Sequence, residues 1–305
     1  MPNYLLDTNC FYSFSKNNLD FNKLREANAN ILACPLNVLE IARCSDDAQD
    51  FHLRKNAMVN LRDIANMFIP KSTDYIMDKS FNQVSSEDNI VINSEDIINC
   101  MINSKSYKEA KNGILVNGKT VRINFDALHE WKHNLSDYFS STMKYDDIAI
   151  LEKIAVYLPN KTSSSEREIK RNSNKRFKEI VNMDIAQILM ITGLGVRVGL
   201  YSAEEYDEVV NNENVEKFDE IIHLAMSKYN YLLDSYIRIY LEFRKERLRN
   251  SPEKNDFFDL EFFTYLDFIR DCVFVTNESK WVEVANRVTN NKLMLQEDFT
   301  NLYSN

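Results

Sequence analysis

The chain has 305 residues, with 37 lysines and arginines against 46 aspartates and glutamates, so its formal net charge is −9. A hydrophobic content of 44% is enough to bury a full core and excludes a globally disordered chain. Five glycines and five prolines are too few for a turn-rich β-sandwich, and the length fits about two domains or one domain with a large insertion.

Cysteine usage and the N-terminal residues bear on the cellular compartment. The five cysteines are scattered and form no Cys-x-x-Cys pair, which supports neither a disulfide framework nor a structural zinc site. The first residues carry no basic signal-peptide region, and no apolar run reaches the roughly 18 residues of a membrane-spanning helix. We therefore expect a cytoplasmic protein of a reducing compartment with no membrane partner.

The two ends of the chain predict strands that alternate with helices. The strands are expected at 4–6, 31–34, 68–70, 272–276 and 292–296. The helices are expected from Pro35 onward, where the missing N–H costs nothing, and over 50–67, 256–270 and 281–288. This alternation is typical of a parallel sheet that helices cover on both faces.

The middle of the chain, about residues 86–249, has a different pattern. Asn117-Gly118 between two apolar runs predicts a β-hairpin over 114–123, because both residues accept the positive φ of a type I′ turn. A polar segment at 160–174 is expected to be a loop. Helical spacing occurs over 126–140, 145–158, 176–192, 203–210 and 215–248. We interpret this block as a mostly helical insertion that divides one α/β domain into residues 1–85 and 250–305.

Acidic residues inside otherwise uncharged strings are the strongest indication of chemistry. Asp7 follows the strand 4–6, and Glu40 lies in the first turns of the helix after the second strand. Glu278 follows the strand 272–276, and Asp256 and Asp259 open the helix that returns to that strand. Open α/β sheets bind ligands at the carboxyl ends of their strands, so these acids are expected to converge on one rim. Buried carboxylates require a partner or a metal, and oxygen-rich clusters bind Mg²⁺ or Mn²⁺.

Each acid also has an ordinary structural interpretation. Asp7 would serve as a helix cap, and Asp256 and Asp259 have the spacing of a capping pair. Glu40 would pair on the helix surface, and Glu278 would be a loop acid. These interpretations are individually reasonable, but all of them at one rim of one sheet are less expected than a shared site.

The same residues resemble the PIN-domain nucleases. Residues 4–9, Tyr-Leu-Leu-Asp-Thr-Asn, are similar to the opening of that family, in which a hydrophobic strand ends in Asp-Thr/Ser-Asn. Residues 35–42 resemble the helix that carries the second acid. Residues 256–259 and 274–278 resemble the closing half, with an Asp at a helix start and a strand that ends in Thr-x-Asp. The chain departs from the family at Glu278, where Asp is usual, and in its long middle block.

The resemblance covers residues 1–85 and 250–305 and implies a three-layer α/β/α domain split by the insertion. It also implies a metal-dependent endoribonuclease that hydrolyses phosphodiester bonds, an activity found in many toxins of bacterial toxin–antitoxin pairs. RNA is the implied substrate, and single-stranded DNA stays open. A regulatory protein or antitoxin, and association of the chain with itself, also stay open.

Site residues follow from the same resemblance. The implied catalytic residues, which are also metal ligands, are Asp7, Glu40, Asp259 and Glu278. Asp256 would be a supporting ligand of the Mg²⁺ or Mn²⁺ ion. Three neutral residues, Thr8, Asn9 and Thr276, would orient carboxylates and water. The bound ion would lower the pKa of a water molecule and stabilise the phosphorane.

An acidic net charge disfavours non-specific binding of nucleic acid, but two segments are locally basic. Residues 161–178 and 238–249 supply the weaker candidates for RNA contacts, which are Lys170, Arg171, Lys175, Arg176, Arg244 and Arg247. Tyrosines near the second segment would stack on bases or pack in the core, and their helical spacing favours the core. They are Tyr229, Tyr231, Tyr236 and Tyr240.

Three other patterns point to different chemistry. Residues 129–133 match the zinc motif His-Glu-x-x-His, but without an evident third ligand an exposed helix face is favoured. The glycines at 193, 195 and 199 do not form a nucleotide-binding pattern and favour a buried turn. A phosphatase with an aspartate nucleophile would need a second Asp at position 9, which is Asn. The alternative to a nuclease is an inactive PIN-like module whose helical insertion binds a protein partner.

Overall fold

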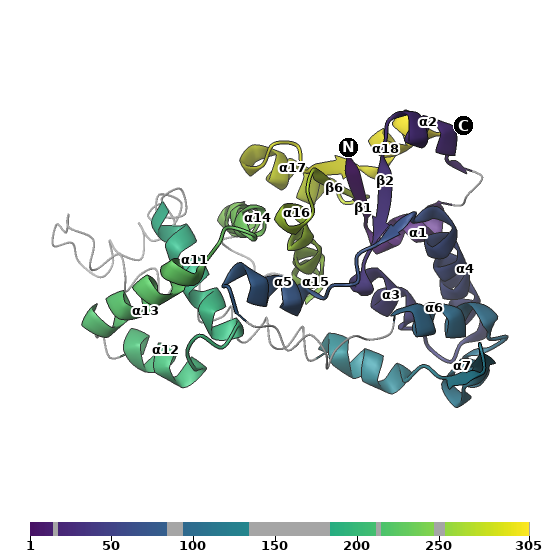
Figure 1. Cartoon of the computed structure of the whole chain (residues 1–305), viewed down its shortest axis with the longest axis horizontal. Helices are drawn as coiled ribbons and strands as arrows, with labels where there is room; N and C mark the ends of the chain where they lie inside the picture. The colour runs from purple at the N-terminus through teal and green to yellow at the C-terminus, as the bar shows by residue number, and fades with distance from the viewer. Residues whose placement is uncertain (15–17, 84–93, 134–183, 212–214, 247–253, 305) are drawn as a thin grey trace.

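The computed structural model describes residues 1–14, 18–83, 94–133, 184–211, 215–246 and 254–304 (Figure 1). Five parallel strands form its central sheet in the order β3-β2-β1-β6-β7. They are β1 (Asn3–Leu6), β2 (Asn30–Ala33), β3 (Met67–Phe68), β6 (Cys272–Thr276) and β7 (Leu293–Leu295). Leu6 of β1 lies opposite Val275 of β6, so the two ends of the chain meet at the centre of the sheet. The expected parallel α/β sheet is confirmed.

Side chains of the central strands alternate between two hydrophobic clusters. Leu5 and Phe274 point to one face of the sheet, while Leu6 and Val275 point to the other, as the two-residue repeat of a strand requires. All four are at most 2% exposed. Burial on both faces explains why these strands are continuous apolar runs rather than alternating ones.

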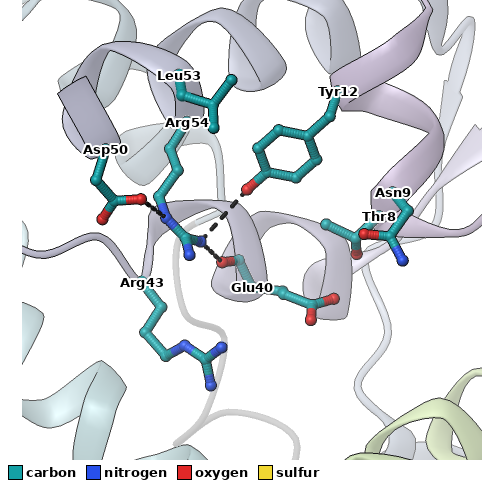
Figure 2. Close-up of a pocket in the computed structure, with 8 residues that line it drawn as sticks. All are labelled: Thr8, Asn9, Tyr12, Glu40, Arg43, Asp50, Leu53 and Arg54. Atoms are coloured by element: carbon teal, nitrogen blue, oxygen red, sulfur yellow. Dashed lines mark hydrogen bonds and ion pairs between the residues drawn. The ribbon is translucent and has the colours of Figure 1, made fainter.

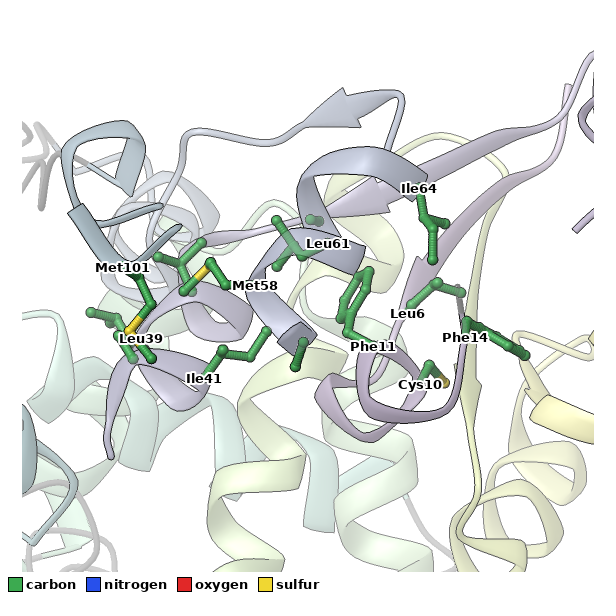
Figure 3. Packing of buried hydrophobic residues seen from close by; sticks show 14 of the residues in the cluster. Leu6, Cys10, Phe11, Phe14, Leu39, Ile41, Met58, Leu61, Ile64 and Met101 are labelled. Carbon is green, nitrogen blue, oxygen red and sulfur yellow. The ribbon is translucent and has the colours of Figure 1, made fainter. Parts of the chain in front are cut away.

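The face that contains Leu6 is covered by helices from the N-terminal part and by the last helix (Figures 1 and 3). These are α1 (Thr8–Ser13), α2 (Phe21–Glu26), α3 (Pro35–Ala42), α4 (Ala48–Ile64), α6 (Ser94–Asn103) and α18 (Gln296–Tyr303). In Figure 3, Leu6 and Phe11 pack beside Leu61 and Ile64 of α4. Short α1 is therefore held in place by its buried side chains, and it begins directly after β1.

The opposite face, which contains Leu5, is covered by helices from the middle and the C-terminal part (Figure 1). These are α5 (Thr73–Ser80), α11 (Asp184–Arg197), α13 (Val215–Lys228), α14 (Asp234–Glu246), α15 (Lys254–Phe263), α16 (Tyr265–Phe268) and α17 (Ser279–Val288). The Phe243 ring of α14 lies 4.5 Å from the Trp281 ring of α17, measured between centroids. Helices therefore cover both faces of the sheet, and part of the middle segment shares the hydrophobic core beneath it. The boundaries at 85/86 and 249/250 stay a prediction.

A buried ion pair joins α11 to α15. The Arg197 guanidinium donates from Nη1 and Nη2 to the two carboxylate oxygens of Glu261, at 2.9 and 3.0 Å, and the Glu261 side chain is fully buried. Such a two-point contact fixes the orientation of both side chains. It connects the middle segment to the helix that carries Asp259.

The hairpin predicted in the middle segment is confirmed. Strands β4 (Ile114–Val116) and β5 (Lys119–Val121) are joined by Asn117 and Gly118, whose φ angles are 50° and 79°. Helix α7 (Tyr107–Asn112) precedes the hairpin, and a helix over 125–133 follows it. The expected helix at 203–210 is α12 (Ala203–Asn211), while the segments 145–158 and 160–174 lie outside the described residues.

Some predicted elements were wrong in extent. The single helix expected over 215–248 is divided into α13 and α14, because Tyr231 adopts a left-handed φ of 68° between them. The helix expected over 256–270 starts two residues earlier and is interrupted at Thr264. The strand expected at 292–296 ends at Leu295, where α18 begins.

The buried turn expected around the three glycines is also wrong. Gly193 and Gly195 lie inside α11, and Gly199, with φ 69°, follows its end. A Cβ atom on Gly195 would collide with the Tyr201 ring, so the missing side chain allows Tyr201 to fold back against the helix. The glycine at 195 therefore serves helix packing.

Candidate active site

Asp7 lies where the central strand ends. Its backbone N–H donates to the Val275 carbonyl at 2.8 Å and extends the contact between β1 and β6. Although Asp7 occupies the position before α1, its side chain makes no capping hydrogen bond. The carboxylate instead accepts a hydrogen bond from Thr276 Oγ1 at 2.8 Å. With only 7% of the residue exposed, this carboxylate is held at the rim by the neighbouring strand.

Asp7 lies within electrostatic range of the other three acids, and Asp259 lies within range of Glu278. Burial raises the pKa of Asp7 to about 7, and the charges of Glu40 and Glu278 add to this effect while the Thr276 hydrogen bond opposes it. Burial also raises the pKa of Asp259 to about 8, with further contributions from Glu278 and Asp7. The parallel topology explains this convergence, because each acid follows the carboxyl end of a strand or lies on a helix beside it.

Asn37 connects the helix of Glu40 to the end of the central strand. Its side-chain oxygen accepts from the backbone N–H of Cys34 at 3.0 Å. Its amide nitrogen donates to the Leu6 carbonyl at 3.0 Å and to Thr8 Oγ1 at 3.2 Å. Asn37 is fully buried and was not identified from the sequence. The signal was available, since Asn37 and Glu40 are the strongly polar residues in the apolar run 31–42.

We expect Asn37→Ala to lower the free energy of unfolding by about 2 kcal/mol, because it leaves buried backbone groups at Leu6 and Cys34 without partners. Urea unfolding followed by circular dichroism measures the change. Asn22→Ala, at an exposed position of α2, is the matched control and should change stability by less than about 0.5 kcal/mol. Equal stabilities of the two variants would show that the Asn37 bridge contributes little.

Two lysines and a tryptophan contact the acids, and none of them was singled out as a site residue. Lys280 Nζ lies 2.8 Å from Asp256 Oδ1 and 2.8 Å from Glu278 Oε2. Although partial burial opposes it, hydrogen bonding to these carboxylates raises the pKa of Lys280. Asp256, which is 1% exposed, is thus an ion-pair partner of Lys280. Asp256 is the third residue of α15, so it lies inside the first helical turn and not at the cap position considered from the sequence.

The remaining acids have weaker partners. Trp281 Nε1 donates to Asp259 Oδ2 at 3.1 Å, and Lys132 Nζ lies 3.9 Å from Glu40 Oε1. In the part of the chain that the structure describes, no lysine or arginine forms an ion pair with Asp7. Asp7 is the most buried of the four carboxylates, and neither Asp7 nor Asp259 forms an ion pair with a lysine or arginine among those residues.

No group of three or more His, Cys, Asp or Glu side chains within the described ranges is arranged so that it could hold a metal ion. The Mg²⁺ or Mn²⁺ site therefore stays a prediction. His129, from the possible zinc motif, has its Nε2 atom 3.2 Å from the Cys44 carbonyl oxygen. That contact gives the His129 ring a structural role on the helix 125–133.

A pocket of about 290 Å³ opens beside the rim (Figure 2). Its lining residues are Thr8, Asn9, Tyr12, Glu40, Arg43, Asp50, Leu53 and Arg54. Thr8, Asn9 and Glu40 are thus shared between the pocket and the acidic rim. Thr8 is buried and held by Asn37, whereas Asn9 is exposed at the pocket.

Most of the basic residues proposed as RNA contacts lie outside the described residues, namely Lys170, Arg171, Lys175, Arg176 and Arg247. Arg244 lies in the last turn of α14 and is partly buried. Among the four tyrosines, Tyr229, Tyr236 and Tyr240 are at most 6% exposed, which confirms the core interpretation for them. Tyr231 is 64% exposed and lies in the break between α13 and α14.

None of the helices described is both long enough and apolar enough to cross a lipid bilayer. Comparisons with protein-family models, with curated proteins and with solved structures each gave no match. The resemblance to PIN-domain nucleases therefore stays a prediction from the sequence.

Proposed function

We propose that this protein is a Mg²⁺- or Mn²⁺-dependent endoribonuclease with a PIN-like site. The observation that carries the proposal is Asp7, a buried carboxylate at the end of the central strand whose neighbours are other carboxylates. Burial of the Asp7 carboxylate is the main cause of its raised pKa, and the like charges of Glu40 and Glu278 raise the pKa further. A divalent cation among these oxygens would offset that repulsion, because it is the largest local charge in such a site.

The donor chemistry fits the proposed ion. Carboxylate oxygens from separate elements suit the hard cations Mg²⁺ and Mn²⁺, and Asp7, Glu40 and Asp259 are the residues that would hold one. Glu278 would join them on release from Lys280. When bound, such an ion lowers the pKa of a water molecule and polarises the phosphate. Thr276 holds the Asp7 carboxylate in orientation through its hydroxyl group.

The protein's own residues also order the rim in other ways. Trp281 holds Asp259 through the indole N–H, and Asn37 fixes Thr8 against the end of the central strand. The Trp281 contact restricts the rotamer of Asp259 before any substrate arrives. Preordered oxygens of this kind lower the reorganisation required when charge develops on a phosphate.

A role as a toxin or a defence effector, with a regulatory protein or antitoxin, extends the proposal. An uncontrolled ribonuclease damages the cell that makes it, so a nuclease of this kind needs a partner that restrains it. Expression of the wild-type chain alone should therefore slow growth, and Asp7→Asn should relieve the effect. Harmless expression of a protein that is active after purification would contradict the partner hypothesis.

Cleavage of a circular single-stranded RNA tests the proposed activity. Because a circle has no ends, only an endonuclease can linearise it. We expect linear products with Mn²⁺ or Mg²⁺ and none with EDTA, measured by denaturing gel electrophoresis of reactions with the purified chain. The absence of cleavage with either metal, together with no binding of Mn²⁺ in calorimetric titration, would exclude the enzyme.

An inactive module that binds a protein partner through its helical segment is the second candidate. One observation favours it, since Lys280 forms ion pairs with both Asp256 and Glu278. The two functions predict different effects of substitution. For the inactive module, Asp7→Asn would leave function intact, whereas changes on the surface of the helical segment would abolish it.

A further inference from the structure

The pocket beside the rim has a positively charged wall built from two arginines (Figure 2). Arg54 of α4 is held rigidly there. It donates from Nε to Asp50 at 2.8 Å, and from Nη1 to the Glu40 backbone carbonyl at 2.9 Å and to Tyr12 Oη at 3.3 Å. These contacts use Nε and Nη1, so the donors on Nη2 are not needed to hold the side chain in place.

Arg43, the C-cap residue that follows α3, provides the second guanidinium. No dashed line reaches it in Figure 2, and within the described ranges no carboxylate forms an ion pair with it. Partial burial and the positive charge of Arg54 lower the pKa of Arg43, while the Glu40 carboxylate opposes this. Two guanidinium groups of like charge thus share one partly enclosed pocket, which favours an anion between them.

Of the two acids that line the pocket, Asp50 offsets the charge of Arg54, while Glu40 points away from Arg43. Asp50 is engaged by Arg54 and also accepts from the backbone N–H and hydroxyl of Ser45 at 2.7 and 2.9 Å. Glu40 extends its carboxylate toward Thr8 and Asn9, at the acidic rim (Figure 2). Arg43 is therefore the guanidinium of the pocket whose charge no ion pair offsets among the described residues. A cation at the rim would neutralise Glu40 and further strengthen the attraction of Arg43 for an anion.

Apolar surface lies next to the arginines. The Leu53 side chain is 55% exposed at the pocket, and the Tyr12 ring lies on the same side in Figure 2. Guanidinium groups that contact a phosphate, with apolar side chains beside them for a base, are the combination by which proteins hold single-stranded nucleic acid. A volume of about 290 Å³ limits the occupant to about one nucleotide.

We infer that this pocket binds one nucleotide of the RNA strand next to the scissile bond, with its phosphate on Arg43 and Arg54 and its base against Leu53 and Tyr12. The inference deepens the proposed function, because the pocket shares Glu40 with the acidic rim. It assigns Arg43 a substrate-binding role that was not inferred from the sequence. Arg54 is the rigid partner, fixed by Asp50.

Fluorescence anisotropy with a labelled single-stranded RNA, in EDTA and over a series of KCl concentrations, tests the inference. We expect Arg43→Gln, which keeps much of the side-chain stem, to weaken RNA binding roughly tenfold, because a hydrogen-bonded charge contact is lost. The slope of log affinity against log salt should fall by about 0.7, the value for one phosphate contact on a single strand. Arg43→Lys should restore part of the affinity and the full slope.

Arg62→Gln is the matched control, because Arg62 lies on α4, is 48% exposed and pairs with Asp63 at 3.0 Å. It should bind RNA as the wild type does, and thermal unfolding should show that the Arg43 variants are folded. Unchanged affinity and slope in Arg43→Gln, or no RNA binding by the wild type, would overturn the inference.

Separate results distinguish this inference from the proposed activity. If the wild type shows metal-dependent cleavage and Arg43→Gln binds RNA normally, the proposed nuclease activity stands and the nucleotide pocket is excluded. RNA binding that depends on Arg43, without cleavage under any metal, would retain the pocket and exclude the nuclease. If both hold, Arg43→Gln should raise KM for RNA more than it lowers kcat.

Discussion

Replacement of Asp7 by Asn should reduce metal-dependent RNA cleavage by at least about 100-fold while the protein stays folded. The substitution removes one negative charge from the rim but keeps the size of the side chain. The amide oxygen can still accept the Thr276 hydrogen bond that holds the carboxylate at 2.8 Å. Because the charge and the hydrogen bond are separated in this way, a loss of activity would report on the charge. Single-turnover cleavage rates with Mn²⁺ measure the effect.

Asp63→Asn provides the control for this experiment. Asp63 lies on α4, is 36% exposed and pairs with Arg62. The same chemical change is therefore made at a surface residue that is not part of the acidic rim. Its cleavage rate should equal that of the wild type. Asp7→Asn should be at least as stable as the wild type at pH 8, because it removes a buried charge. Full activity of Asp7→Asn would remove Asp7 from the proposed mechanism.

In the absence of divalent ions, the free energy of unfolding should rise as the pH is lowered from 8 toward 5. The folded-state pKa of Asp7 is about 7, and that of Asp259 is about 8, each raised from 3.8. At pH values between 3.8 and the raised folded-state pKa values, the folded protein binds more protons than the unfolded chain. The free energy of unfolding therefore falls as the pH rises. Since one pKa unit corresponds to about 1.4 kcal/mol, Asp7 alone would contribute up to about 4 kcal/mol over its full range.

Mn²⁺ should act on the same groups in the opposite direction. At pH 8 millimolar Mn²⁺ should raise the unfolding temperature, because it binds the folded protein and offsets the repulsion between Asp7 and Asp259. At pH 5 the effect should be small, since protons compete for the same oxygens. Differential scanning calorimetry at both pH values measures these shifts.

Asp7→Asn is the decisive variant for this pH prediction. It should flatten the rise in stability between pH 8 and 5 and reduce the stabilisation by Mn²⁺. Asp63→Asn should change neither, because Asp63 lies outside the acidic rim. A wild type whose stability does not depend on pH in this range would contradict the raised pKa values.

Much of the fold could be predicted from the sequence because the central strands are short, uncharged runs bounded by polar residues. The runs at 4–6, 31–34 and 272–276 correspond to β1, β2 and β6 within one residue at each end. Strand direction followed from the alternation with helices, and the direction of parallel strands brought Asp7 and Glu278 to one edge. The hairpin at Asn117-Gly118 was equally local, since two consecutive residues determine the turn.

Long-range packing explains the elements that the sequence did not reveal. Helical spacing runs through Tyr231 without a visible stop, yet the chain turns there so that α14 can pack against α17. The glycine pattern in the sequence did not predict that Tyr201 folds back against Gly195 of α11. Local propensity is weak compared with burial of a helix face, so packing against distant segments decides where such helices end.

For the candidate site as well, some features could be predicted from the sequence and others depended on tertiary packing. Sequence alone identified the acids, because a charge within an uncharged run is unusual wherever the chain later folds. Their partners depended on three-dimensional contacts: Lys280 bridges Asp256 and Glu278, Asn37 joins α3 to the end of β1, and Arg43 faces a pocket with Arg54. Each of these contacts acts over a few ångströms. The residues that form it are not separated by a fixed number of positions in the sequence, so no motif reveals the contact. A residue's type therefore indicates what chemistry it can supply, while the packing of distant segments determines which charges and hydrogen bonds it meets.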